Sequence, residues 1–233
     1  MSARRPASAL RPRRRAASRA GFTLVELVVV MGVIAVLASI GLAVVLMSAR
    51  AQREIGTRDL VARVASLVDG WHQQFGAYPP DDLRGLAFAT NLPIRVEGTP
   101  NATNAGIECV VQGLGLPETR MKGRFEAKER SNTDRDSLDR PIAPGLSALL
   151  YEVRDEWGHP LVYIENRDYL PFEAHPPLYL RGTGTDDGAP GEPVRPRPWR
   201  LGAGRGFAEP AGFQLYSMGP DGIPNTDDDI RSW

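Results

Sequence analysis

The chain has 233 residues, 42% of them hydrophobic, which suffices for one large or two small domains around a sizeable core. Its formal net charge is zero, but the first 21 residues hold seven arginines and no acid, which leaves 21 basic and 28 acidic residues for the remainder. That acidic balance argues against a nucleic-acid-binding surface on the main body. The single cysteine, Cys109, excludes an internal disulfide, and the three histidines show no metal-ligand spacing.

An uncharged segment follows the basic leader, residues 1–21. From Leu27 to Ala49, 23 consecutive residues carry no charge, and a helix of that length spans a bilayer core of about 30 Å. The arginines before it predict a cytoplasmic amino terminus and place the carboxyl-terminal body across the membrane. The run is too long for a cleaved secretory signal.

The helical pattern continues beyond the uncharged run, because apolar residues recur at three- and four-residue steps. They are Leu60, Val64, Leu67, Val68, Trp71 and Phe75. We therefore predict one helix from near Phe22 to near Phe75, about 80 Å long. Its first part, residues 22–49, is a transmembrane and assembly helix, and its second part, residues 50–76, packs one face on a globular head.

Glu26 is the one charge near the start of this apolar helix. An ionised carboxylate in hydrocarbon costs several kcal/mol unless it is paired, so such a residue is a functional candidate. Two interpretations remain open on position alone. Glu26 either lies in the headgroup layer, where its cost is small, or has a partner of opposite charge.

The stretch "RAGFTLVELVVVMGVIAVLASI" resembles the class III signal of type IV pilins and pseudopilins, in which Gly, an aromatic residue and a helix with Glu at its fifth position follow a basic leader. The resemblance implies that a prepilin peptidase cuts between Gly21 and Phe22 and methylates the new amino terminus of Phe22. It also implies that this amino group, from the same or an adjacent subunit, is the partner of Glu26 during assembly.

The body, residues 77–233, begins where Pro79 and Pro80 stop the long helix. Two long loops are expected, at about residues 94–145 and 182–210. Three short runs bounded by turn residues are expected as strands of one small antiparallel sheet. They are Pro160–Asn166, Pro177–Leu180 and Gly212–Met218. The predicted fold class is α+β: a long amino-terminal helix packed on a small sheet, as in type IV pilins.

The carboxyl-terminal loop, residues 216–233, concentrates aspartates that must be solvated or neutralised by a cation. Composition alone favours a solvated acidic tail. The order S-x-G-x-D-G, T-x-D-D-I and a terminal Trp is similar to the calcium loop of major pseudopilins of type II secretion systems. That similarity implies a structural Ca²⁺ bound by Asp221, Asp228 and Asp229, with carbonyl oxygens from Met218 and Thr226. Asp227 is an extra acid that competes with Asp228 for the role.

The resemblance implies a non-catalytic subunit of the type II secretion pseudopilus, anchored in the inner membrane with its head in the periplasm. Its implied partners are further copies of itself, minor pseudopilins, the prepilin peptidase, an inner-membrane assembly platform and the lipid bilayer, without nucleic acid. The alternatives are a minor pseudopilin or a type IV pilin. A third possibility is a membrane-anchored enzyme that uses Asp155 and Glu156 beside His159, or the terminal aspartates, as acid and base, although no nucleophile arrangement supports it.

Overall fold

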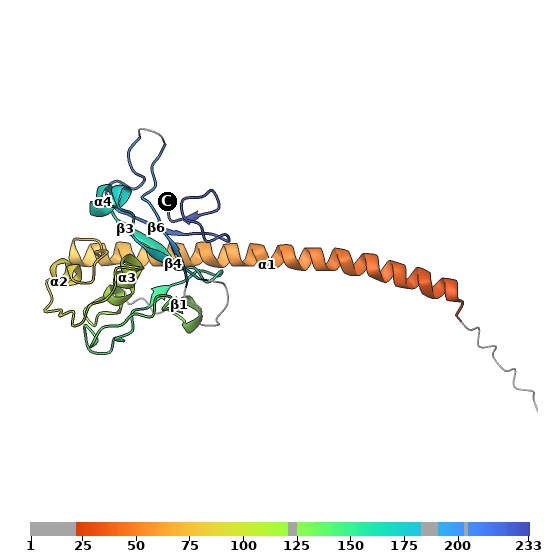
Figure 1. Ribbon diagram of the computed structural model, residues 1–233, viewed down its shortest axis with the longest axis horizontal. Helices are drawn as coiled ribbons and strands as arrows, with labels where there is room; N and C mark the ends of the chain where they lie inside the picture. Colours follow the sequence, from red (N-terminus) through yellow and green to blue (C-terminus); the bar gives the residue numbers. More distant parts are fainter. Residues whose placement is uncertain (1–21, 121–124, 183–190, 203–204) are drawn as a thin grey trace, which may run out of the picture. The chain divides into compact units, whose positions relative to one another are not determined.

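The computed structural model describes residues 22–120, 125–182, 191–202 and 205–233. The leader, with Gly21, lies outside the described residues, as do parts of both expected loops. The chain divides into two compact units, residues 1–48 and 49–233, and helix α1 (Leu24–Phe75) contributes to both (Figure 1). The fold is α+β, with a long amino-terminal helix and small antiparallel sheets, as the sequence predicts.

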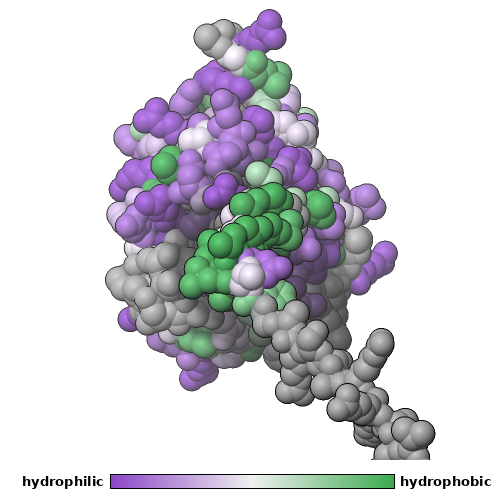
Figure 2. All heavy atoms as spheres, turned by 90° about the vertical axis from the view of Figure 1, so that its right-hand side faces the viewer, coloured by the Kyte–Doolittle hydropathy of each residue, from purple (hydrophilic) through white to green (hydrophobic). Residues whose placement is uncertain are grey.

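In the first unit, the apolar part of α1 leaves its side chains exposed. Fifteen large hydrophobic residues between Leu24 and Met47 are each at least 45% exposed. Figure 2 shows hydrophobic side chains gathered along this part of the helix. Among the described residues, α1 is the helix that is long and apolar enough to cross a membrane.

In the second unit, α1 buries one face, as the periodic pattern predicts. Five residues of this face are buried: Leu60, Val61, Val64, Val68 and Trp71. Leu67 and Phe75, which belong to the predicted stripe, are half-buried and pack against the core. Gly76, at φ +75°, follows the last helical residue in a conformation that favours glycine.

Three small antiparallel sheets accompany the helix. The largest has the order β3 (Val162–Glu165), β6 (Phe213–Ser217), β7 (Ile230–Arg231), with Tyr163 opposite Leu215 and Ser217 opposite Ile230. The strand β4 (Tyr179–Arg181) does not join it. It pairs instead with β5 (Glu192–Val194), so the expectation of one sheet containing all three predicted runs was wrong.

The expected loop of residues 94–145 contains regular structure that the sequence reading missed. Helix α3 (Ala105–Gly115) is buried over most of its length, and strand β1 (Arg130–Ser131) pairs with β2 (Glu152–Val153). The second expected loop contains β5. The remaining elements are α2 (Gly85–Thr90), η1 (Ala127–Glu129), η2 (Asn166–Asp168) and α4 (Tyr169–Ala174).

The core of the second unit forms where α3, β3 and β6 pack with the buried face of α1. Trp71 is fully buried, and a Cβ on Gly113 of α3 would lie 3.1 Å from its ring, so glycine permits the close approach of these helices. The Tyr163 hydroxyl donates a hydrogen bond of 2.6 Å to the carbonyl oxygen of Pro79 and ties β3 to the segment after α1.

Candidate functional site

Thr23 and Glu26 form a reciprocal pair of hydrogen bonds at the start of α1. Oε2 of Glu26 accepts from the backbone N–H of Thr23 at 2.9 Å and from its hydroxyl at 2.8 Å. The Glu26 N–H lies 3.2 Å from Thr23 Oγ1, and the Thr23 carbonyl accepts the first helical bond, from Leu27. This is a capping box, in which a Thr and a Glu three residues later satisfy each other's backbone donors.

The capping of α1 by Thr23 is a contact that the sequence analysis did not predict. The signal was present, because Thr-x-x-Glu before an apolar run is typical of a helix start. Phe22, the residue before Thr23, is 79% exposed. Glu26 is thus hydrogen-bonded to Thr23, which is the second residue after the predicted cleavage point between Gly21 and Phe22.

The carboxyl-terminal loop is built by its own hydrogen bonds. Asp228 Oδ1 accepts from the Thr226 hydroxyl, and Asp229 Oδ2 accepts from the Asn225 N–H at 2.8 Å. Asp221 Oδ1 accepts from the Ile223 N–H at 2.7 Å. Burial raises the pKa of Asp229 to about 7, and the neighbouring charge of Asp228 adds to this shift.

Gly219 lets two segments of this loop approach each other closely. Gly219 and Gly222 both have φ +64°, in the left-handed region that favours glycine. A Cβ on Gly219 would lie 2.8 Å from Asp228 Oδ2 and 2.6 Å from the Asp228 carbonyl oxygen. Asp228 therefore faces the backbone beside Met218, whereas Asp227 is exposed.

The five predicted ligands fit a hard cation by donor chemistry, since carboxylate and carbonyl oxygens are what Ca²⁺ prefers. Asp228 and Met218 lie on facing segments, and Asp229, the residue after Asp228, is buried. The three aspartates do not form a compact carboxylate group, however. Among the described residues, the one group of three acidic ligands with atoms within 4.8 Å of one another is Glu108, Asp134 and Glu152.

Asp155, an acid in the enzyme alternative, has its carboxylate engaged in the fold. Its Oδ1 accepts from the N–H groups of Trp157 and His159, each at 2.9 Å, and its Oδ2 accepts from the Ser217 hydroxyl at 2.5 Å. These bonds close the 155–159 turn and join it to β6. Trp157, which lies in this turn, is half-buried.

The comparisons with known proteins concern the amino-terminal segment. Residues 17–42 match a model described as the prokaryotic N-terminal methylation motif. The motif is typical of type IV pilin-like proteins and pseudopilins, which assemble with one another and are processed by prepilin peptidase. The match includes Gly21, Phe22, Thr23 and Glu26. No curated protein and no solved structure matches the chain significantly.

Proposed function

From the methylation motif at residues 17–42, we propose that this chain is a structural filament subunit and, more specifically, the major pseudopilin of a type II secretion system. In this proposal, prepilin peptidase removes residues 1–21 and methylates Phe22. Before assembly, the subunit remains anchored in the inner membrane with its head in the periplasm. Copies then assemble on an inner-membrane platform, with minor pseudopilins, into a pseudopilus that drives export of folded proteins.

The structural observation that supports the proposal, beside the motif, is the exposed apolar surface of α1 with one acid at its start. Fifteen large hydrophobic side chains on all sides of the helix are exposed, which is unfavourable in water. Lipid covers such a surface before assembly, and copies of the same helix cover it afterwards. An apolar helix compatible with a single-pass membrane anchor is what both states require.

Glu26 supplies the polar contact in this proposal. Its Oε2 is held by Thr23 at the helix start, one residue from the amine that cleavage creates on Phe22. A carboxylate and an ammonium attract strongly in a medium of low dielectric constant, and removing one leaves the other unpaired. The pair therefore favours one register of a subunit against its neighbour in the filament.

The experiment compares Glu26→Gln with Glu26→Ala in cells that express the secretion system. Gln keeps an acceptor for the Thr23 N–H but has no charge, so it separates helix capping from ion pairing. We expect both variants to be inserted and cleaved, and both to fail to form filaments. Filaments from Glu26→Gln at the wild-type level would contradict the proposal.

We also propose that Ca²⁺ stabilises the carboxyl-terminal loop. Asp221, Asp228 and Asp229 would hold the ion with carbonyl oxygens of Met218 and Thr226, and the ion would neutralise their mutual repulsion. What supports this is the position of Asp228 against Gly219 and the burial of Asp229. The bound ion would link the last loop to the end of β6, in a chain with a single cysteine.

We propose no catalytic role for the head. The support is that the Asp155 carboxylate accepts three hydrogen bonds from its own turn and from β6, which leaves it poorly placed as an acid or base. A hydrolase screen of the purified protein tests this proposal. Turnover that is abolished by Asp155→Asn or His159→Ala, with the fold retained, would contradict it.

A further inference from the structure

Glu108 is a buried carboxylate without a hydrogen-bond partner. It lies in the first turn of α3, its exposed fraction is 0%, and neither Oε1 nor Oε2 has a partner. Burying an unpaired ionised carboxylate costs several kcal/mol, so native proteins pair or neutralise such groups. Glu108 therefore requires a proton or a cation that the side chains around it do not supply.

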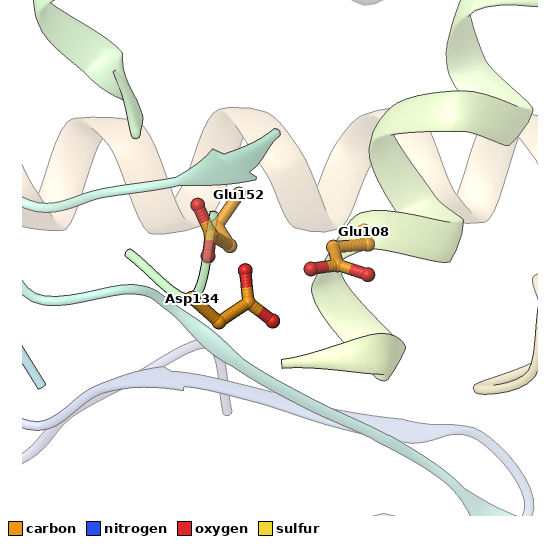
Figure 3. A group of neighbouring side chains, drawn as sticks. All are labelled: Glu108, Asp134 and Glu152. Atoms are coloured by element: carbon orange, nitrogen blue, oxygen red, sulfur yellow. The ribbon is translucent and has the colours of Figure 1, made fainter. Parts of the chain in front are cut away.

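The side chains that Glu108 faces are also acidic. Oxygen atoms of Glu108, Asp134 and Glu152 lie within 4.8 Å of one another, and Figure 3 shows the Asp134 carboxyl group between the other two. The three residues come from α3, the loop after β1, and β2. None of the ion pairs among the described residues involves this group, which we call the α3 acid cluster.

Glu152 is held in place by hydrogen bonds to its carboxyl group. Its Oε1 accepts from the Asn104 side-chain amide at 2.7 Å, from the Thr133 hydroxyl at 2.9 Å and from the Thr133 N–H at 3.0 Å. Asn104 is buried at φ 55°, and its carbonyl accepts the N–H of Glu108 at 3.2 Å. The residue before α3 thus fixes both the helix start and an acid of the cluster.

Like charges and burial act together in the α3 acid cluster. Burial and the charges of Asp136, Asp134 and Glu152 raise the pKa of Glu108 to about 10. Burial and the charges of Asp134 and Glu152 raise the pKa of Asp136 to about 7. A bound divalent cation reverses this electrostatic situation, because it favours the ionised form of every carboxylate around it.

We propose that Glu108, Asp134 and Glu152 bind a hard divalent cation, namely Ca²⁺. One Ca²⁺ at 2.3 to 2.6 Å from each ligand reaches oxygens that are up to about 4.8 Å apart. The group contains only carboxylates, which disfavours Zn²⁺ and other metals that prefer nitrogen or sulfur. Asp134 is half-buried as a residue, but both of its carboxylate oxygens are buried and have no hydrogen-bond partner, as in Glu108. Any water that completes the coordination would therefore be enclosed with the ion.

This site is separate from the carboxyl-terminal loop and has a different structural effect. It joins three segments that are far apart in sequence, at residues 108, 134 and 152, and all lie outside residues 216–233. In Figure 1, β1 and the carboxyl terminus lie on opposite sides of the Ala49–Phe75 part of α1. The ion would fix α3, which carries part of the core, to the paired strands β1 and β2.

Calorimetric titration of the full-length chain in detergent with CaCl₂ alone tests the site. We expect Glu108→Gln to bind one Ca²⁺ fewer per chain than the wild type, and Asp228→Asn to lose a different one if the carboxyl-terminal loop also binds. Glu118→Gln, an exposed Glu outside the cluster, is the matched control and keeps the wild-type number. An unchanged number in Glu108→Gln would overturn the proposal, whatever Asp228→Asn does.

Thermal unfolding in chelator shows whether the variants fold. Gln is neutral without taking up a proton, whereas Glu108 must be protonated to be buried without metal. In chelator we therefore expect Glu108→Gln to melt at or above the wild-type temperature, and to gain less from Ca²⁺ than the wild type. If Glu108→Gln does not fold, Asp134→Asn at the half-buried position must show the loss of one Ca²⁺. The same comparison is made with MgCl₂. If Glu108→Gln loses a binding site for Mg²⁺ but binds as much Ca²⁺ as the wild type, the assignment of calcium is overturned.

Discussion

Oε2 of Glu26 accepts hydrogen bonds from both the backbone N–H and the hydroxyl of Thr23, so the acid of the apolar helix also caps that helix. Capping and the proposed pairing of Glu26 with an amine make different demands on Thr23. Capping needs the Thr23 side chain, whereas pairing with an amine needs only the carboxylate.

Thr23→Val separates the two roles from the side of Thr23. Valine has nearly the shape of threonine, and its backbone N–H still donates to Glu26, but the hydroxyl contacts are lost. Because the charge of Glu26 remains, we expect filament yield close to that of the wild type. Electron microscopy of sheared filaments measures it, with Thr23→Ser as the control that keeps the hydroxyl. A loss as complete as in Glu26→Gln would show that Glu26 acts by starting the helix.

Asp228→Asn is expected to remove the calcium dependence contributed by the carboxyl-terminal loop. At a calcium concentration 100 times the Kd, binding adds about 2.7 kcal/mol to the free energy of unfolding, which the variant would lose. Thermal unfolding of the full-length chain in Ca²⁺ and in chelator measures the difference. Asp227→Asn, whose side chain is exposed, is the matched control and should behave as the wild type. An equal calcium shift in Asp228→Asn and the wild type would contradict the loop site.

Trp71→Ala is expected to lower the free energy of unfolding by about 3–5 kcal/mol, because it leaves a large cavity between α1 and α3. Trp71 is fully buried, 4.3 Å from the Phe75 ring between centroids, and its indole N–H has no partner. Trp71→Phe should therefore cost less. Phe88→Ala, at a side chain that is 91% exposed, is the control, and chemical denaturation is the measurement. Equal stabilities of Trp71→Ala and Phe88→Ala would contradict this core.

Asp81 is expected to make stability depend on pH. Burial and the charges of Asp168 and Glu165 raise its pKa to about 8, although Arg167 pairs with Glu165 nearby. The folded chain therefore binds more protons than the unfolded chain between about pH 4 and pH 8, where an ordinary Asp is already ionised. This contribution to stability is present at low pH, falls as the pH rises through that interval and is lost above about pH 8.

Asp81→Asn should flatten this part of the pH profile and raise the melting temperature most at about pH 8 and above. Melting temperatures at fixed ionic strength across the interval test it, with the exposed neighbour Asp82→Asn as control. A profile for Asp81→Asn that runs parallel to that of the wild type would show that the carboxyl group of Asp81 is not the cause.

The elements with a long or strong periodic pattern were predictable from the sequence. The predicted helix from near Phe22 to near Phe75 is observed as Leu24–Phe75, and two of the three predicted runs contain β3 and β6, which pair with each other. The pairing of β4 was not predictable, because its partner β5 lies in a segment rich in Gly and Pro and contains Pro193. Proline marks an edge position and weakens any strand pattern.

The candidate sites differ in how local their signals are. Glu26 and the terminal aspartates could be singled out from the sequence because the residues next to them form recognisable motifs. Helix α3 was missed because its short apolar run, flanked by Asn104 and Gly115, does not distinguish helix from loop. The α3 acid cluster brings together acids from residues 108, 134 and 152, whose separations follow no metal-binding spacing, so only the tertiary fold reveals it.

Mass spectrometry of the amino terminus of the protein from its native membrane tests the central claim most directly. The claim is that an amine created on Phe22 neutralises Glu26 when subunits assemble. We predict a mature chain that begins at Phe22, carries one methyl group on its amino nitrogen and lacks residues 1–21. A native chain that retains its arginine-rich leader would contradict the claim, because Phe22 would then be in a peptide bond with Gly21 and offer no amine.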